Sequence, residues 1–244
     1  GVTRWEMRTD VNGVYDGETV FSAAEAIEII LKELDAWKQE DYENRQSFSF
    51  GIIWQGMRSG SVEDVTEKLL QAYNLREQFP ETILGFDLVG HEDPGKTLLY
   101  WAPILLNIEE SVMKSTNIST KMPFFFHAGE SNRGNVQENL VDAVFLNTSR
   151  IGHGFGLQEF PALWPSLTMN GILIESCPIS NQVLGLVVDQ RNHPVGQMLH
   201  HALHNPMRRE RTVPPRLAEL LVHEPSLVDL IANNVVSPAF AVAI

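Results

Sequence analysis

Three apolar segments in the second half of the chain each end in polar or ionisable residues, and this arrangement limits the folds that the chain can adopt. The run 123–126 (Pro-Phe-Phe-Phe) leads into 127–130 (His-Ala-Gly-Glu), and 150–154 (Arg-Ile-Gly-His-Gly) ends in a histidine between glycines. A third apolar segment, 171–178, ends in Glu-Ser-Cys-Pro. Unbroken apolar runs are typical of strands buried on both faces of a parallel sheet. Polar residues at the carboxyl ends of several such strands are typical of the site of an α/β protein.

Strand-like and helix-like segments alternate through most of the chain. Ser22 and Glu25 form the pattern of a capping box at the start of an amphipathic helix. Helices are predicted over 22–43, 61–79, 96–115, 136–147, 157–169 and 180–189, and strands over 2–8, 48–54, 82–88, around His127, over 150–154 and over 171–177. Buried strands that alternate with helices predict a parallel α/β fold.

The composition of the chain argues against several classes of protein. With 244 residues and 43% hydrophobic content, the chain is long enough for one domain of barrel size with a full core. The net charge of −13 argues against nucleic acid or an anionic membrane as the main partner. No apolar run reaches the about 18 residues that a membrane-spanning helix needs. The single cysteine, Cys177, excludes an internal disulfide framework.

Four of the strand-end segments resemble, in order and spacing, the motifs of the adenosine deaminase family. They are 85–90 (Gly-Phe-Asp-Leu-Val-Gly), 127–130, 150–154 and 175–181 (Glu-Ser-Cys-Pro-Ile-Ser-Asn). Any one of them alone is weakly specific, but four on successive strands are strongly so. The segments 90–93 (Gly-His-Glu-Asp) and 191–194 (Arg-Asn-His-Pro) resemble the secreted growth-factor branch, the adenosine deaminase 2-like proteins. The similarity runs from about residue 5 to residue 195.

The resemblance implies a (β/α)8 TIM barrel of the metal-dependent hydrolase type, with one zinc ion at the carboxyl ends of its strands. It implies that His127 binds the metal, that Glu130 protonates N1 of the purine, and that His153 orients the attacking hydroxide. Zinc lowers the pKa of a bound water, so that hydroxide is available near neutral pH. The implied reaction is hydrolysis of adenosine, or of 2′-deoxyadenosine, to the inosine product and ammonia.

Four further residues are candidates for substrate binding. The resemblance implies that the backbone N–H of Gly90 binds the purine, and that Glu6 and His91 reach the ribose. Gly129 lets a ligand approach the backbone closely, because glycine has no side chain. We therefore expect a purine nucleoside as the partner, and neither nucleic acid nor a membrane, while a homodimer stays open.

The chain departs from the family pattern at two places. Its first histidine is His91, so the His-x-His pair of zinc ligands on the first strand has no counterpart, and no Asp-Asp pair follows residue 195. One ligand, His127, is therefore matched, and a single protein ligand does not hold zinc tightly. The sequence predicts a partial barrel over 1–195, strands two to seven of the family pattern, which by itself is inactive. A divergent helical and Pro-rich tail over 196–244 and open edges at 2–8 and 171–177 are also predicted.

Other interpretations remain open for these residues and for the whole chain. The histidines at the strand ends could be structural, and Glu130 could cap a helix. His200 and His204 have the spacing of two zinc ligands on a helix, but a solvated helix face is favoured. The alternative function is a non-catalytic nucleoside-binding or growth-factor-like signalling protein.

The resemblance also implies an extracellular location. Two glycosylation sequons, at Asn117 and Asn147, permit a secreted setting, although such triplets also arise by chance. No signal peptide is recognised at Gly1, so we expect either a mature chain or one whose N-terminal part is missing.

Overall fold

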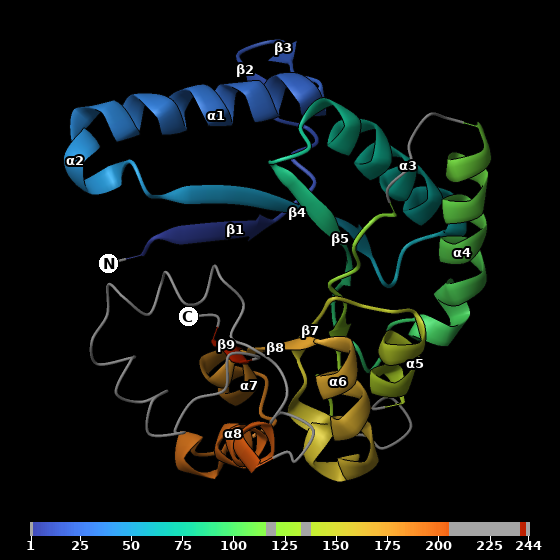
Figure 1. Ribbon diagram of the computed structural model, residues 1–244. Coiled ribbons are helices and arrows are strands. Elements are labelled where there is room, and N and C mark those ends of the chain that lie inside the picture. The colour runs from blue at the N-terminus through green and yellow to red at the C-terminus, as the bar shows by residue number, and fades with distance from the viewer. Residues whose placement is uncertain (1, 116–120, 133–137, 205–239, 243–244) are drawn as a thin grey trace. The chain divides into compact units, whose positions relative to one another are not determined.

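The computed structural model describes residues 2–115, 121–132, 138–204 and 240–242 (Figure 1). The chain forms two compact units: Gly1–Val89 with Pro103–Pro123, and Gly90–Ala102 with Phe124–Ile244. Each unit has its own parallel sheet.

The sheet of the first unit contains three parallel strands. They are β1 (Arg4–Arg8), β4 (Ser49–Met57) and β5 (Ile83–Val89), in the order β1-β4-β5. Trp5 pairs with Phe50, and Trp54 pairs with Phe86. The middle of β4 is buried over four consecutive residues, as expected for a parallel strand that is covered on both faces.

Helices α1 (Ala23–Glu40), α2 (Tyr42–Arg45) and α3 (Val62–Gln78) connect these strands (Figure 1). The predicted capping box is confirmed: the Ser22 side chain accepts the backbone N–H of Glu25, and the Glu25 carboxylate accepts the backbone N–H of Ser22. Ser61 caps α3 by accepting the backbone N–H of Asp64. Both helices therefore begin where the sequence predicts, because these side chains satisfy N–H groups that have no partner within the helix.

The sheet of the second unit contains four parallel strands, in the order β6-β7-β8-β9. They are β6 (His127–Ala128), β7 (Arg150–His153), β8 (Leu173–Ser176) and β9 (Phe240–Val242). The α-helices of this unit are α5 (Asn139–Phe145), α6 (Trp164–Asn170), α7 (Pro178–Val183) and α8 (Val195–His204), and the 3₁₀ helices are η1 (Phe155–Glu159), η2 (Pro161–Leu163) and η3 (Gln190–Asn192). Helix α4 (Leu98–Ser115) begins in this unit and continues into the first.

Large apolar side chains fill each unit. Trp54 and Phe86 are fully buried in the first unit, and Phe126 and Ile151 are fully buried in the second. Full burial of such a side chain stabilises the fold by about 1.5–3 kcal/mol. The apolar strands recognised in the sequence therefore form part of the cores of the two units. The polar residues follow at the carboxyl ends of these strands. None of the described helices is long and apolar enough to cross a bilayer.

Most predicted elements are present with shifted ends, but several predictions are wrong. An antiparallel hairpin of β2 (Tyr15–Asp16) and β3 (Thr19–Val20) is not among the predicted elements. The helix predicted over 157–169 is instead η1, η2 and α6, because Pro161 lacks the N–H that a continuous helix needs. The helix predicted over 180–189 is α7, which begins earlier at Pro178, since proline is favoured in the first helical turn.

The prediction of an open edge at 171–177 is also wrong. Strand β9 pairs with β8, with Ile174 opposite Phe240 and Ser176 opposite Val242. This strand is not among the predicted elements of the tail. The apolar stretches between Leu217 and Ile231 lie outside the described residues, and the domain boundary at residue 195 stays a prediction.

Candidate active site

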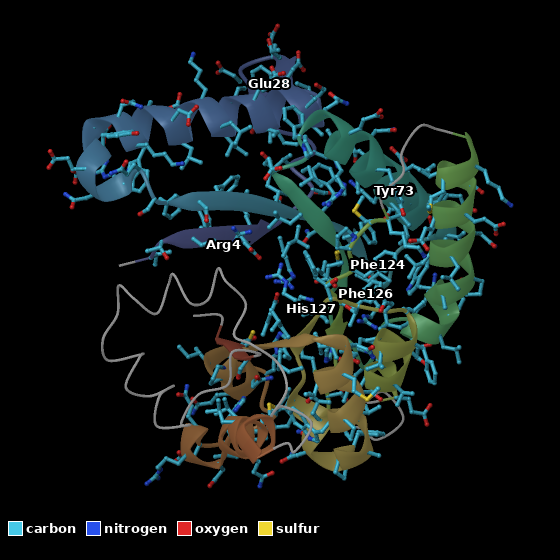
Figure 2. The ribbon with its side chains drawn as sticks, in the orientation of Figure 1. Arg4, Glu28, Tyr73, Phe124, Phe126 and His127 are labelled. Carbon is cyan, nitrogen blue, oxygen red and sulfur yellow. The ribbon has the colours of Figure 1, made fainter. Side chains whose placement is uncertain are left out.

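His127 begins β6, directly after the apolar run 123–126 (Figure 2). The rings of Phe124 and Phe126 stack with centroids 4.8 Å apart. Pairing of β6 with β7 places His127 opposite Gly152, where an added Cβ would lie only 3.3 Å from the His127 Cα. Because Gly152 has no side chain, His127 packs closely against β7. The imidazole rings of His127 and His153 are neighbours, with centroids 5.2 Å apart.

His153, which is buried, and Glu130, which is mostly buried, form a pair at the ends of these strands. The His153 Nε2 lies 3.0 Å from the Glu130 Oε1, and the two side chains are 5% and 11% exposed. His153 has a φ of +63°, and the following Gly154 has a φ of +58°. A non-glycine residue in this left-handed region carries strain of about 1–3 kcal/mol, and such strain clusters at functional sites. The structure thus brings together the two residues predicted to be catalytic.

The buried carboxylate of Glu92 holds the loop that carries Glu130. Its Oε1 accepts the backbone N–H of Gly129 at 3.1 Å, and its Oε2 accepts that of Glu130 at 2.6 Å. The Oε1 also accepts Nδ2–H of Asn139 at 2.7 Å, and the Asn139 Oδ1 accepts the backbone N–H of Leu98 at 2.7 Å. Charge-assisted bonds from backbone N–H groups to a carboxylate are strong. Glu92 therefore fixes the direction in which the Glu130 side chain leaves the backbone.

The second ring nitrogen of His153, Nδ1, takes part in a series of hydrogen bonds between buried side chains. Asn181 Nδ2 lies 3.1 Å from His153 Nδ1, and Asn181 Oδ1 lies 3.1 Å from His193 Nε2. The His193 Nδ1 accepts the backbone N–H of Val195 at 3.0 Å. Burial lowers the pKa of His193 below its ordinary value, which favours the neutral ring.

The residues predicted to bind substrate have different surroundings. Gly90 follows β5 with a φ of +102°. The side chain of His91 is 61% exposed, and its Nε2 lies 3.9 Å from Asp93 Oδ2. Gly129 has a φ of +72°, and an added Cβ would come within 2.8 Å of Leu140. Gly129 therefore meets two requirements for glycine, a left-handed backbone and a close neighbour.

Glu6 belongs to the first unit, whereas Glu130 belongs to the second. It lies on β1, where its Oε1 is 2.5 Å from the Nε of Arg4. In the same unit, the Nε of Arg8, the last residue of β1, lies 2.8 Å from the fully buried carboxylate of Asp87 on β5. A role for Glu6 toward the ribose stays a prediction.

The described part of the chain does not by itself fit a zinc ion. Among the described residues, no three His, Cys, Asp or Glu side chains are grouped so that they could hold a metal. Structural and catalytic zinc sites use at least three protein ligands. His127 is thus a single candidate ligand within this part of the chain.

The sequence motifs assigned no role to Glu92, Asn181 or His193. All three lie within the quoted motifs 90–93, 175–181 and 191–194. They are 1%, 0% and 6% exposed as residues. A polar residue that is buried needs hydrogen-bond partners, but the sequence does not show which polar residues are buried.

Comparison with known proteins shows which family this chain resembles. The family model for adenosine deaminase matches residues 46–207. Adenosine deaminase 2 of Homo sapiens is 45% identical over 150 residues, which is 61% of this chain and 28% of that protein. An adenosine deaminase of Aedes albopictus is 42% identical over 193 residues, which is 78% of this chain and 34% of that protein. The chain thus spans about a third of the length of these relatives.

Solved structures show the same fold. The N6-methyl-AMP deaminase from Arabidopsis thaliana, in its apo form, superposes with a TM-score of 0.59 at 18% identity. The alignment covers 83% of this chain and 55% of that one. The α/β fold with parallel strands, of the (β/α)8 barrel type, is therefore confirmed for the part that aligns.

Proposed function

Because the chain belongs to the adenosine deaminase family, we propose that Glu130 is the acid–base residue of a purine nucleoside deaminase and that His153 orients its attacking hydroxide. The proposed reaction is hydrolysis of adenosine, or of 2′-deoxyadenosine, to the inosine product and ammonia. The observation that carries the proposal is the mostly buried pair itself, with His153 Nε2 and Glu130 Oε1 separated by 3.0 Å. Titratable groups that are paired and buried at strand ends are candidates for proton transfer.

Each residue has a role that follows from the chemistry of the purine. Addition of water at C6 makes that carbon tetrahedral: the oxygen bonds to C6, the Glu130 carboxyl supplies a proton to N1, and the resulting carboxylate takes the proton that the water loses. The C6–N bond then breaks as Glu130 passes this proton to the departing amine, which leaves as ammonia, and the C6 hydroxyl returns its proton to Glu130 as the C6=O bond of the product forms. A proton that moves through one carboxyl group needs that group at a fixed position, and Glu92 holds the Glu130 backbone there.

Binding of the purine in this proposal uses backbone groups. The N–H of Gly90 contacts the ring, and Gly129 gives the ring access to the loop that carries Glu130. His91 is exposed on its loop, so it is able to move toward a ribose when a nucleoside binds. Glu6 is proposed as a second ribose contact, on the family resemblance alone.

Zinc is the proposed cofactor, with His127 as the one ligand from the described residues. Its further ligands would come from other residues than those described, since the His-x-His pair that the resemblance implies has no counterpart in the sequence. When bound, the metal would supply an activated water near neutral pH.

The proposed function is tested by incubating the native protein with adenosine and measuring both released ammonia and bound nucleoside. Ammonia release with inosine formation supports the deaminase. Saturable binding of adenosine with no ammonia release, even after zinc is added, would instead favour the non-catalytic nucleoside-binding protein. Absence of both binding and turnover would contradict both proposals.

An extracellular location is proposed with this function. Asn147 and Ser149 of the second sequon are both exposed, at the carboxyl end of α5, so an oligosaccharide could be attached there without unfolding. A loss of mass on treatment with a peptide N-glycosidase would support this location, whereas an unmodified Asn147 in the native protein would count against it. The homodimer stays a prediction, which light scattering of the native protein checks.

A further inference from the structure

The hydrogen bonds that run from Val195 through His193 and Asn181 to His153 have a fixed direction. A backbone N–H can only donate, so the Nδ1 of His193 must accept from Val195 at 3.0 Å. A neutral imidazole whose Nδ1 accepts carries its proton on Nε2. The Nε2–H of His193 then donates to Asn181, whose oxygen lies 3.1 Å away.

The orientation of the Asn181 amide follows from this. Since its oxygen is used by His193, its NH₂ group faces the Nδ1 of His153 at 3.1 Å. An amide nitrogen can only donate, so the Nδ1 of His153 accepts and carries no proton. The proton of the neutral His153 ring is therefore on Nε2, which faces Glu130 at 3.0 Å.

We propose that Asn181 and His193 are positioning residues that hold His153 in the Nε2–H tautomer, so that His153 acts as a hydrogen-bond donor toward Glu130 and the reacting groups. Neither residue reaches Glu130 in the structure's hydrogen bonds; both act through the ring of His153. The proposal rests on the proposed function only in placing His153 at the reaction centre.

Because the three side chains are buried, the hydrogen bonds between them control the tautomer of His153. The residues His153, Asn181 and His193 are 4%, 0% and 6% exposed, so water does not compete freely for these ring nitrogens. The ring of Phe155 packs edge-on against His193, with centroids 5.6 Å apart at 74°. This contact opposes rotation of the His193 ring, which keeps its Nε2 directed at Asn181.

The test reads the tautomer directly. The full chain is labelled with ¹⁵N in its histidines, and long-range ¹H–¹⁵N spectra are recorded near pH 8.5, about two units above the ordinary imidazole pKa of about 6.5. His153 and His193 are each expected to show a protonated Nε2 and an unprotonated Nδ1. A native His153 with its proton on Nδ1 would overturn the proposal without any variant.

Substitutions of Asn181 then test the cause. In Asn181→Asp the carboxylate can only accept, so Nδ1 of His153 should gain a proton. In Asn181→Leu the donor to Nδ1 is lost, so the two tautomers should mix. Asn192→Asp is the matched control, because it makes the same chemical change at the exposed end of η3 and should leave His153 in the Nε2–H form.

Substitutions of His193 test whether the direction is set beyond Asn181. His193→Gln keeps an N–H donor for the Asn181 oxygen and should preserve the tautomer, whereas His193→Leu removes the donor and should mix the tautomers. An unchanged Nε2–H pattern in both folded Asn181 variants would show that Glu130 alone sets the tautomer. If those variants lose the native spectrum, His193→Gln and His193→Leu are compared instead. The Nε2–H tautomer of His153 in His193→Gln but not in His193→Leu supports the proposal, and the same tautomer pattern in both variants overturns it.

Adenosine turnover provides a second readout that separates this inference from the proposed function. In an active native protein, Asn181→Asp should lower kcat by about 10²-fold or more, with KM little changed, since the loss lies in proton positioning. A native protein without turnover contradicts the proposed function, but the tautomer spectra still decide the role of Asn181 and His193.

Discussion

The carboxylate of Glu92 accepts the backbone N–H of Glu130 at 2.6 Å. Glu92 lies in the loop after β5 and Glu130 in the loop after β6, so one buried side chain joins two strand-end loops. The same carboxylate accepts the N–H of Gly129 and of the Asn139 side chain. Glu92 is therefore the structural support of the proposed general acid.

Glu92→Gln is expected to destabilise this loop. Glutamine has one acceptor oxygen, so its NH₂ group would face at least one of the three N–H groups that the carboxylate now satisfies. A buried donor left without an acceptor costs about 1–3 kcal/mol. The free energy of unfolding in urea measures this loss. The exposed Glu159 provides the control, and a Glu159→Gln change should leave the unfolding curve where it is. Equal curves for the two variants would contradict the role of Glu92.

Glu130→Gln is expected to remove most deaminase activity of the native protein. The amide still offers an oxygen to His153 Nε2–H, but it cannot deliver a proton to N1. General acid–base groups contribute about 10²–10⁴-fold to the rate, and kcat for adenosine hydrolysis measures this. Glu138→Gln near the start of α5 is the control. Near-normal kcat in Glu130→Gln would show that another residue is the acid.

His127→Ala is expected to lower zinc binding by the native protein and to lower its activity in parallel. The single candidate ligand of the described part would be lost, whereas His91→Ala removes an exposed imidazole and should leave the metal in place. Zinc content by elemental analysis, measured beside ammonia release, distinguishes the two. Full zinc occupancy in His127→Ala would exclude it as a ligand.

Gly129→Ala is expected to cost more stability than Gly185→Ala. The two glycines have φ values of +72° and +73°, so both variants carry the left-handed penalty of about 1–2 kcal/mol. An added Cβ at Gly129 lies 2.8 Å from Leu140, whereas at Gly185 it meets nothing within 4 Å. Overpacking adds about 1–3 kcal/mol. Equal shifts of the two variants in thermal unfolding would show that Leu140 moves away without cost.

The buried Tyr73 side chain leads us to expect that the fold loses stability in alkaline solution. Burial raises its pKa from 10.0 to about 12, because the folded core disfavours the charged phenolate. A group whose pKa is raised by folding contributes stability that is complete below the unfolded pKa and is lost as pH rises through the folded one. The loss should therefore fall between about pH 10 and 12.

To check the prediction, the free energy of unfolding is measured for the native chain and for Tyr73→Phe between about pH 10 and 12. The Tyr73→Phe variant should lose less stability than the native chain over this pH range. Tyr42→Phe alters an exposed tyrosine and should follow the native curve. Parallel curves for the native chain and Tyr73→Phe would show that the ring is not buried in solution.

The sequence by itself determined where the main strands lie and which polar residues follow at their ends. Apolar runs, capping residues and turn residues act locally, so β4, α1, α3 and β7 lie close to where the sequence places them. The strand-end motifs are equally local, which is why the sequence alone selects His127, Glu130 and His153. It does not select strand β9, because that strand is formed by pairing with β8 across a separation of more than sixty residues of chain.

Only the tertiary structure decided how the selected residues are joined. The contact of His153 with Asn181 spans 28 positions in the chain, and that of Glu92 with Gly129 spans 37. Such contacts depend on burial, on loop direction and on left-handed backbone at His153 and Gly129, none of which a residue's identity fixes. The sequence therefore determined which groups stand at the strand ends, and the tertiary structure decided which atom of each group faces the next, because hydrogen-bond direction is a property of three-dimensional position.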